Sequence, residues 1–507
     1  MASGSAAEVP AESRSKAEEE RVSIFQLGLS IMTLFVPLFA ARLSWIGMKT
    51  TDTALLGHSG TDYLTASSLA DFWTGAFAPF LMDSVLGSKL GPAYGAKNYD
   101  NVGIWVQVST TLYSWAMIPV FMSFVLTGPA LQHLIRTPEN IAGYAGYYST
   151  VLAFCLPARL ISGKISSFFN AQTKTRPTVV TTALAVTLNL AFGLQLVLGI
   201  PFTSFGSYGF WACPVVTTCV EWFVTGIYYF VYCTYLRCHD QCWGAVPAQW
   251  SFFRDVFLAP VLARKGDERF VYYNEHIRPK IWDYAKLAFP ANLALASDFW
   301  RMSVIGLLAG SLGYKDVGVF NASYRLAWMN LTIIGSFSTA ACTQLGIAMG
   351  SGDGGKCKRI VGFGISTVAS FLLVTIALTI SFIEFLGSIF SSDPELIEMF
   401  VECRYAMGFM IFFMCFSMHF ELVLFCVGKS KVVARASIVG SWMGQVPAVL
   451  LMIHLLGAKL QAVYFGVGIG YAFYFLLVFS AFIGIDWNEQ ARTKYEENKK
   501  KEPLVGK

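Results

Sequence analysis

The chain has 507 residues, of which 55% are hydrophobic and 14% are charged. Soluble domains carry about 25% charged residues, so this composition excludes an ordinary soluble domain. Apolar runs of about 18 or more residues recur along the chain, and a run of that length can cross the core of a bilayer. The sequence therefore predicts an all-α polytopic membrane protein, in which the net charge of +5 matters less than its placement.

The first residues are polar and charged, and they predict a disordered cytoplasmic tail over 1–22. Residues 488–507 are also polar and predict a second cytoplasmic tail. Between the tails the sequence predicts twelve transmembrane helices, at approximately 31–56, 64–88, 103–127, 141–168, 178–201, 208–236, 283–310, 317–345, 360–390, 397–427, 432–456 and 460–485.

The basic loop residues gather after the even-numbered spans, on one side of the predicted membrane. Because cytoplasmic loops carry an excess of lysine and arginine, both termini are predicted to be cytoplasmic. The longest loop, 237–282, is interpreted as a cytoplasmic linker between an N-terminal six-helix lobe at 23–236 and a C-terminal six-helix lobe at 283–487. The plasma membrane and a vacuole-type organelle membrane are both open as the site of residence.

A weak internal repeat supports two similar halves. The heptapeptides LGPAYGA at 90–96 and LGIAMGS at 345–351 each follow the second span of their half. An even number of spans per repeat gives both halves the same orientation, with a central cavity between them. The glycines of these segments are expected to let helix backbones approach closely and to carry no chemistry.

An ordered set of motifs resembles those of the multidrug and toxic compound extrusion (MATE) transporters. The segment ACTQLGIAMGSGDGGKCKR at 341–359 is similar to the family's A-S-T-R-V-G-N-x-L-G-A-G-N-P-x-x-A-K-R. The segment GPAYGAKNY at 91–99 is similar to the family's G-Q-A-x-G-A-K-Q-Y. Further similarities follow the family's order at DTALLG (52–57), FNAQTKTRP (169–177) and Asp486-Trp487.

This resemblance implies twelve helices in two six-helix lobes, with a MATE-like inverted-V architecture. It also implies a secondary active antiporter that exports organic compounds (drugs, toxins or metabolites) in exchange for protons or sodium by alternating access. The expected partners are a small organic substrate, H⁺ or Na⁺ and the lipid bilayer, with no nucleic acid. We expect a monomer without a metal site, and no cofactor beyond the ion gradient.

Two charged residues, Asp298 and Arg301, lie in the middle of the predicted span 283–310 and one helical turn apart. A charge at that depth costs about 2.5–3.5 kcal/mol on insertion scales, and such groups usually face a bundle interior or a cavity. A structural ion pair is the alternative interpretation. The resemblance places Asp298 at the family's helix-7 acid and implies ion coupling there. Arg301 is then a candidate for ion coupling or substrate contact, and Trp300 for lining the substrate cavity.

Asp52 matches the family's helix-1 acid and is the second candidate for ion coupling. Lys49 precedes it by one helical turn, so it is a candidate partner for Asp52 and a candidate substrate-cavity residue. The family's helix-10 acid has no clear counterpart, and Glu421 with the neighbouring His419 is the candidate substitute.

Basic residues in other spans are expected to pair or to extend toward the membrane surface, although so many of them suit a cavity for anions. They are Arg42, Arg159, Lys164, Arg325 and Arg404.

Two alternatives remain beside the antiporter. A lipid-linked precursor flippase of the wider exporter superfamily would need a deep hydrophobic groove and a cationic cavity. A membrane-embedded transferase would need convergent histidines or acids, and the histidines of this chain are dispersed. Asn321-Ala-Ser is a glycosylation sequon whose use stays open.

Overall fold

The computed structural model of the chain describes residues 11–134, 136–200, 207–242, 271–310, 312, 314–390, 394–457 and 459–499. All regular elements in these ranges are helices, as the composition predicts. The first half contains α1 (Ala11–Ser59), α2 (Thr61–Phe77), η1 (Ala78–Leu81), α3 (Gly87–Gly95), α4 (Tyr99–Val125), α5 (Thr127–Leu134), α6 (Glu139–Ala153), α7 (Cys155–Ala171), α8 (Arg176–Gly193), η2 (Leu194–Leu198), η4 (Gly209–Trp211), α9 (Ala212–Ile227), η5 (Tyr228–Tyr235) and η6 (Asp240–Cys242).

The second half contains the remaining helices. They are η7 (Tyr273–Ile277), α12 (Arg278–Gly310), α13 (Tyr314–Gly350), α14 (Gly354–Ser381), α15 (Ile383–Phe390), α16 (Pro394–Val427), α17 (Ser430–Ile438), η8 (Val439–Gln445), α18 (Val446–Leu456), α19 (Leu460–Ile483) and α20 (Trp487–Lys499). Most of the predicted linker, residues 243–270, lies outside the described residues. The sequon at Asn321 falls within α13, but its side chain is not among those described.

Within the described ranges, nine helical stretches are long and apolar enough to cross a membrane. The pair α6–α7, which bends by 40°, adds a tenth. These stretches coincide with ten of the twelve predicted spans. The predicted span 64–88 falls on the interrupted segment α2–η1–α3, and the span 283–310 falls on α12, which carries charges along its length.

α1 begins at Ala11, so residues 11–22 are helical where the sequence predicts a disordered tail. This segment is rich in Ala, Glu, Lys and Arg, which are strong helix formers, and it continues an apolar helix that is already nucleated. Low hydrophobicity indicates that the segment is not buried in a core, but it does not exclude an exposed helix.

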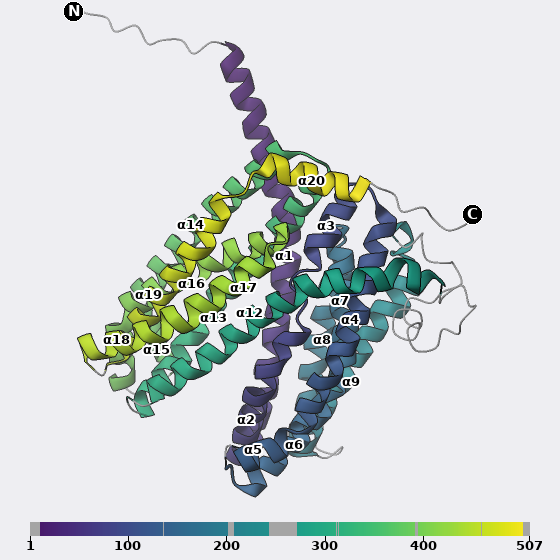
Figure 1. Cartoon of the computed structure of the whole chain (residues 1–507). Coiled ribbons are helices and arrows are strands. Elements are labelled where there is room, and N and C mark those ends of the chain that lie inside the picture. Colours follow the sequence, from purple (N-terminus) through teal and green to yellow (C-terminus); the bar gives the residue numbers. More distant parts are fainter. Residues whose placement is uncertain are drawn as a thin grey trace, which may run out of the picture.

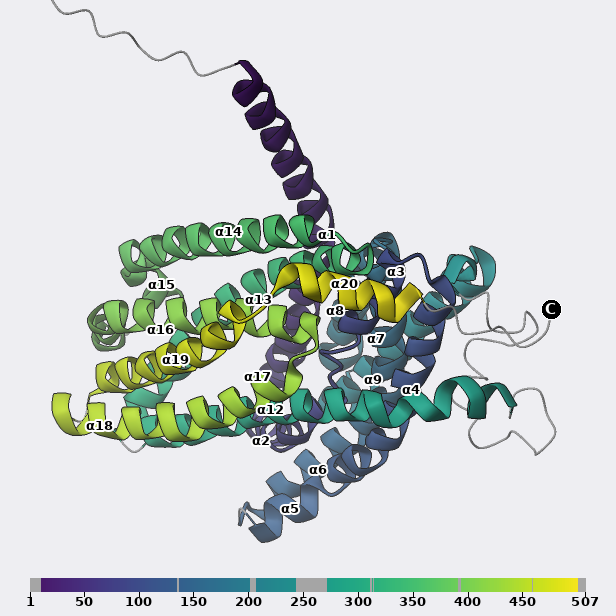
Figure 2. The same ribbon diagram turned by 45° about the horizontal axis from the view of Figure 1, so that its top comes forward.

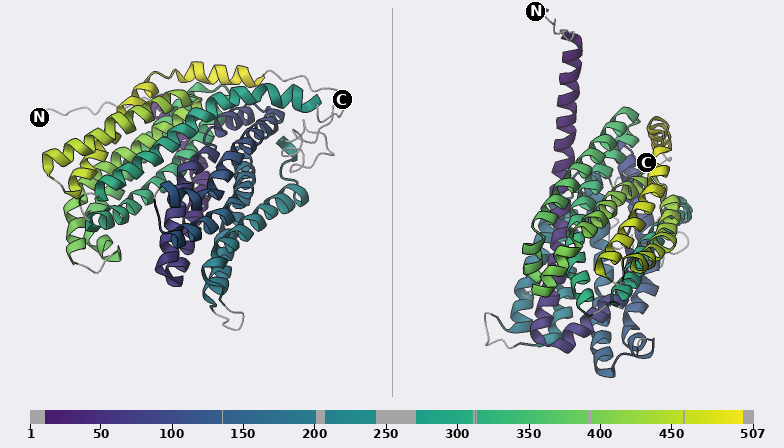
Figure 3. Two further views of the ribbon diagram at one scale, coloured as in Figure 1. Left: turned by 60° about the horizontal axis from the view of Figure 1, so that its bottom comes forward. Right: turned by 90° about the vertical axis from the view of Figure 1, so that its left-hand side faces the viewer.

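The two halves form groups of helices that meet at one end of the molecule and diverge toward the other (Figure 1). The meeting end carries α3 and α20, and the N-terminal part of α1 projects from it (Figures 1 and 2). The same divergence is visible in the left-hand view of Figure 3, whereas the two groups overlap in the right-hand view. We call the end with α3 and α20 the closed end. This arrangement is the inverted V that was expected from the sequence.

Backbone contacts between α3 and α13 hold the closed end together. A Cβ atom added at Gly91 would lie 3.0 Å from the Cα of Gly346. A Cβ at Gly95 would lie 2.1 Å from the carbonyl oxygen of Ile347, and a Cβ at Gly350 would lie 2.0 Å from that of Pro92. The two similar heptapeptides therefore pack against each other, and the prediction that their glycines serve close packing is confirmed.

The segment predicted as the second span breaks between η1 and α3. Pro79 lies within η1, and the Asp83 carboxylate accepts a hydrogen bond from the backbone N–H of Leu86 at 3.1 Å. This contact occupies a backbone donor at the start of α3. The break exposes backbone carbonyls, and α12 donates to two of them: Asn292 to Phe80 at 3.0 Å and Trp300 to Ala76 at 3.2 Å.

α20 lies across the closed end and contacts α3, α13 and α14 (Figure 2). Asn98 donates to the backbone oxygen of Asn498 at 2.8 Å, which connects α20 to the first half. Gln490 donates to the oxygen of Val427 at 3.3 Å, which connects it to the second half. Residues 488–499 of the predicted C-terminal tail therefore belong to a packed helix.

Candidate ion-coupling and substrate sites

Asp298 of α12 lies in a polar cluster of the second half. Its Oδ1 atom accepts from Arg301 at 2.8 Å and from Ser437 and Ser441 at 3.2 Å each. The two serines come from α17 and η8, so the carboxylate connects two helical segments. The structure therefore contains the ion pair that the sequence left as an alternative to ion coupling.

Arg301 is sealed inside this cluster, with 3% of its side chain exposed. It also donates to Ser441 and to the Tyr471 hydroxyl, both at 2.8 Å. Its guanidinium carbon lies 4.9 Å from the centre of the Tyr471 ring. Three different groups thus fix the guanidinium in one orientation, and the Asp298 side chain is the more exposed partner at 30%.

Glu421 of α16 belongs to the same cluster. It is 7% exposed and lies within electrostatic range of Asp298 and Arg301. The buried hydroxyl of Tyr474 lies beside its carboxylate, although no hydrogen bond of normal geometry forms there. The cluster therefore contains two carboxylates and one guanidinium.

His419 lies on the opposite side of α16, since two residues along a helix are about 200° apart. Its Nδ1 atom is 2.7 Å from the Ser338 hydroxyl of α13, and its ring lies against Gly364 of α14. Its Nε2 atom has no hydrogen-bond partner among the described residues. The structure thus brings Glu421, and not His419, to the cluster that contains Asp298.

Asp52 is buried in the first half, with 4% exposure. Thr217 of α9 donates to both of its oxygens, at 3.1 and 3.0 Å, and Asn189 of α8 donates at 3.3 Å. Lys49 does not pair with it but forms an ion pair with Asp71 of α2 at 2.6 Å. The Asp52 side chain points toward α8 and α9, so the lysine one turn earlier meets α2 instead.

Trp300 is 36% exposed, and its indole N–H donates to α2 as described above. The ring therefore lies where the second half meets the first. A role in lining a substrate cavity stays a prediction for Trp300 and for Lys49.

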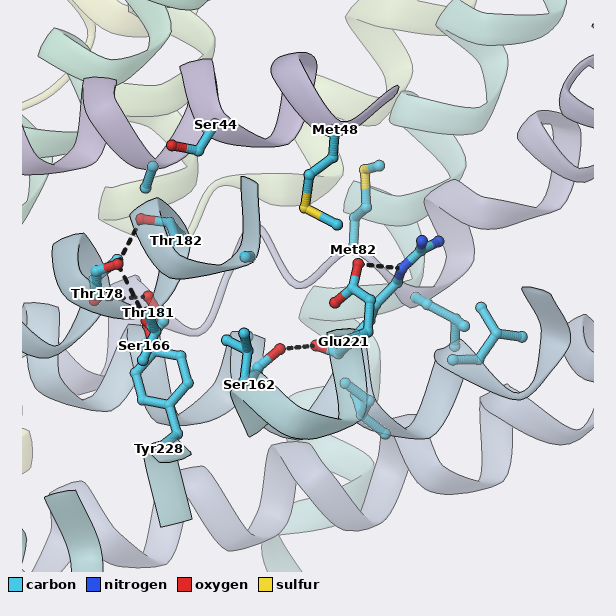
Figure 4. A pocket seen from close by; sticks show the side chains of 18 of the residues that line it. Ser44, Met48, Met82, Ser162, Ser166, Thr178, Thr181, Thr182, Glu221 and Tyr228 are labelled. Carbon is cyan, nitrogen blue, oxygen red and sulfur yellow. Dashed lines mark hydrogen bonds and ion pairs between the residues drawn. The ribbon is translucent and has the colours of Figure 1, made fainter. Parts of the chain in front are cut away.

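A pocket of about 410 Å³ lies in the first half (Figure 4). It contains the ion pair between Arg159 of α7 and Glu221 of α9, whose Nε and Oε1 atoms are 3.1 Å apart. Arg159 is one of the basic residues that were expected to pair or to suit a cavity for anions, whereas Glu221 was not predicted to belong to any site.

A second buried network, which the sequence did not predict, is centred on Asp83 at the break after η1. Its carboxylate pairs with Lys164 of α7 and accepts from Ser109 of α4 and Tyr284 of α12, the last at 2.7 Å. Lys164 and Asp83 are 81 positions apart, and no local spacing connects them. The only available signal was that both are charged residues inside predicted spans.

The family model MatE matches residues 37–194 and 290–450, which together are more than half of the chain. Multidrug and toxin extrusion protein 1 of Homo sapiens is 23% identical over 384 residues, which cover 75% of this chain and 61% of that protein. Protein DETOXIFICATION 17 of Arabidopsis thaliana is 24% identical over 379 residues, which cover 72% of this chain and 70% of that protein. The matches to two relatives of Mus musculus span 60% and 59% of the length of those proteins.

The fold is also similar to solved structures. The eukaryotic MATE transporter AtDTX14 has a TM-score of 0.78 at 16% identity, over 94% of this chain and 99% of that chain. An outward-facing multidrug resistance MATE family transporter has a TM-score of 0.72 at 14% identity, over 93% and 96%. The resemblance read from the motifs and the predicted fold class are both confirmed. This chain belongs to the MATE family of multidrug extrusion transporters, which are multi-pass membrane proteins and not enzymes.

Proposed function

We propose that the chain is a secondary active antiporter, which exports small organic compounds in exchange for protons or sodium ions by alternating access. The observation that carries this proposal is the buried cluster of Asp298, Arg301 and Glu421. Asp298 is paired with Arg301, and Glu421 lies within electrostatic range of both, so the cluster has one carboxylate more than it has guanidinium groups.

The excess carboxylate favours binding of a cation by the cluster. The Asp298 carboxylate already has a cationic partner in Arg301 and two serine donors. An uncompensated buried carboxylate is costly, so it takes up a proton or another cation. Glu421 is therefore the proposed exchange group, beside an Asp298–Arg301 pair that fixes its surroundings.

Coupling follows when the ion and the substrate compete or favour different conformations. If protonation of Glu421 weakens substrate binding, substrate binding must weaken proton binding by the same factor. Asp52, which is buried without a cation within ion-pair distance in the described part of the chain, is a second proposed coupling residue in the first half.

The proposed orientation places the closed end and both termini in the cytoplasm. The basic loops support this orientation through the positive-inside rule. The structure would then represent a state whose cytoplasmic side is closed, and alternating access would require the contacts between α3 and α13 to separate. The proposed division into lobes at 23–236 and 283–487, with a linker at 237–282, follows from the same interpretation.

The flippase alternative gains no support from the apolar groove between α1 and α8. This groove has a volume of about 1060 Å³, which is large enough for an acyl chain. Among the described residues that line it, none is basic, so it offers no cationic site for a lipid-linked phosphate.

The test is transport into proteoliposomes under an imposed pH or sodium gradient. We expect accumulation of an organic dye that depends on the gradient in the wild type and is lost in Glu421→Gln. Glu402→Gln is the matched control, because Glu402 lies exposed on the same helix. Equal gradient-driven accumulation by Glu421→Gln and the wild type would contradict the proposed exchange group.

A further inference from the structure

The pocket of the first half lies between several helices and the break in the second span, with Phe124 of α4 and Tyr228 of η5 also in its lining. Residues of α1, α7, α8 and α9 form its walls, and Leu81 and Met82 lie beside the break. A volume of about 410 Å³ falls in the range that holds a drug-sized ligand. Most of the lining is apolar, including Leu156, Leu160 and Val224.

The polar groups of the pocket lie at separate places. Figure 4 shows Ser166, Thr178 and Thr181 close together on one side and Glu221 on the other. The hydroxyls of Ser166 and Thr178 are 3.2 Å apart, so this side offers neutral hydrogen-bonding groups. The only charged groups among the described lining residues are Arg159 and Glu221.

Arg159 is more exposed than the basic residues that pair with Asp83 and Asp298. The Arg159 side chain is 30% exposed, whereas Lys164 and Arg301 are 4% and 3% exposed. The ion pair uses the Nε atom of Arg159, and the described residues supply no other side-chain hydrogen bond to its guanidinium. The two terminal amino groups of Arg159 therefore keep their hydrogen-bonding capacity for a ligand.

We propose that this pocket selects substrates that carry both a carboxylate and a cationic nitrogen on an apolar body. Arg159 would bind the carboxylate and Glu221 the cationic nitrogen. This inference deepens the proposed function and rests on it, because it names the substrate class of the transporter.

The chemistry of the pair favours a ligand that carries both charges. The terminal amino groups of a guanidinium form a fork that matches the two oxygens of a carboxylate. The Arg159–Glu221 pair is neutral as a unit, so a ligand with a single charge leaves an uncompensated charge in a mostly apolar pocket. A zwitterion gives each member of the pair a second partner and keeps the total at zero.

The apolar part of such a ligand has suitable neighbours. Met48 and Met82 lie near Glu221 in Figure 4. Methionine side chains are flexible and polarizable, so they adapt to aromatic rings of different shape. Asp52 is close enough to influence Arg159 but is absent from the lining, since Thr217 and Asn189 enclose it.

The test uses two dyes that differ in one group. Rhodamine 110 has a free carboxyl group, and rhodamine 123 is its methyl ester and carries only the positive charge. Binding to the purified full-length protein is measured by fluorescence anisotropy without any gradient. A hydrogen-bonded charge contact contributes about 1.5–3 kcal/mol, so we expect the wild type to bind the carboxylate dye about tenfold more tightly than the ester.

Arg159→Gln should bring the ratio of the two affinities close to one. The double variant Arg159→Gln/Glu221→Gln removes both charges at similar volume, so it tests the same ratio without leaving Glu221 unpaired. Arg492→Gln is the control for loss of a surface arginine, since that side chain is 79% exposed, and it should keep the wild-type ratio.

Three results would overturn the inference: equal affinity of the wild type for both dyes, no binding of either dye, or the wild-type preference in the double variant. Gradient-driven uptake of the same dyes separates this inference from the antiport proposal. Discrimination in binding without gradient-driven uptake of either dye contradicts antiport alone. Uptake of both dyes without discrimination contradicts the selectivity of the pocket alone.

Discussion

The hydroxyl of Tyr284 in α12 donates to the Asp83 carboxylate at 2.7 Å and so connects the second half to the break in the first. Further along α12, Asn292 and Trp300 donate to backbone oxygens of the same broken segment. The helix then continues into the polar cluster through Asp298 and Arg301. One helix thus contacts the broken segment of the first half and carries Asp298 and Arg301, which lie within electrostatic range of Glu421. A change at Glu421 can therefore reach the interface between the halves through α12.

Tyr284→Phe is expected to lower the stability of the structure by about 1.5–3 kcal/mol, since it removes a hydrogen bond to a charged group and keeps the ring. The measurement is thermal unfolding in detergent. Tyr405→Phe provides the control, because Tyr405 is 60% exposed and loses the same hydroxyl. Equal melting temperatures for the two variants would show that the Tyr284 contact contributes nothing to stability.

Replacement of Asp83 by asparagine should cost more than this, about 3–5 kcal/mol, because it leaves the ammonium of Lys164 buried without its counter-charge. The double variant Asp83→Asn/Lys164→Met removes both charges and should recover a large part of the loss. Chemical denaturation or thermal unfolding of the wild type, the single variants Asp83→Asn and Lys164→Met, and the double variant gives the coupling energy. Additive losses in the double variant would contradict a direct ion pair.

The roles of Asp298 and Glu421 can be separated by charge-neutral replacement. Asp298→Asn should abolish gradient-driven transport, but that result is ambiguous because it leaves Arg301 buried and unpaired. The double variant Asp298→Asn/Arg301→Gln preserves the excess negative charge of the cluster. We therefore expect it to keep gradient-driven transport within about tenfold of the wild type.

The proteoliposome assay checks this expectation, with the amount of folded protein measured by size-exclusion chromatography. A folded but inactive double variant would assign the exchanged ion to Asp298, as the family resemblance implies. Transport in the double variant combined with none in Glu421→Gln would assign it to Glu421.

Much of the fold was predictable because it depends on local patterns. The apolar runs locate most of the spans, and the similar heptapeptides at 90–96 and 345–351 identify segments that contact each other. The break after η1 was harder to predict from the sequence, because Pro79 alone does not distinguish a kinked span from an interrupted one. Residues 11–22 include strong helix formers, but their polar and charged composition led to the prediction of a disordered tail.

The candidate sites were harder to predict because their partners come from distant helices. Asp298 and Arg301 were paired correctly, since they lie one turn apart on one helix. The same rule failed for Lys49, whose partner Asp71 lies on another helix. Glu421 and His419 were grouped as neighbours in sequence, although helix geometry already places them on opposite faces. The contacts of Tyr471 and Ser441 with Arg301 depend on how distant helices pack, and the spacing of residues in the sequence does not predict that packing.

Gly95→Ala provides a direct test of the closed end. The added Cβ would lie 2.1 Å from the Ile347 oxygen, which is a backbone atom and cannot rotate away, so α3 and α13 must separate. Overpacking of this kind costs about 1–3 kcal/mol. We expect a lower melting temperature and faster amide hydrogen exchange in α3 and in the facing part of α13.

Gly87→Ala is the matched control on the same helix, because a Cβ at position 87 would meet no heavy atom within 4 Å. Removal of a glycine from the first turn of a helix restricts the unfolded chain, so Gly87→Ala should leave stability unchanged or slightly raised. If Gly95→Ala and Gly87→Ala behave alike in both measurements, the contact between α3 and α13 is not what holds the two halves together. If only Gly95→Ala loosens these helices, the paired glycines set how tightly the halves meet, and larger residues at Gly91 or Gly346 should favour conformations in which this end is open.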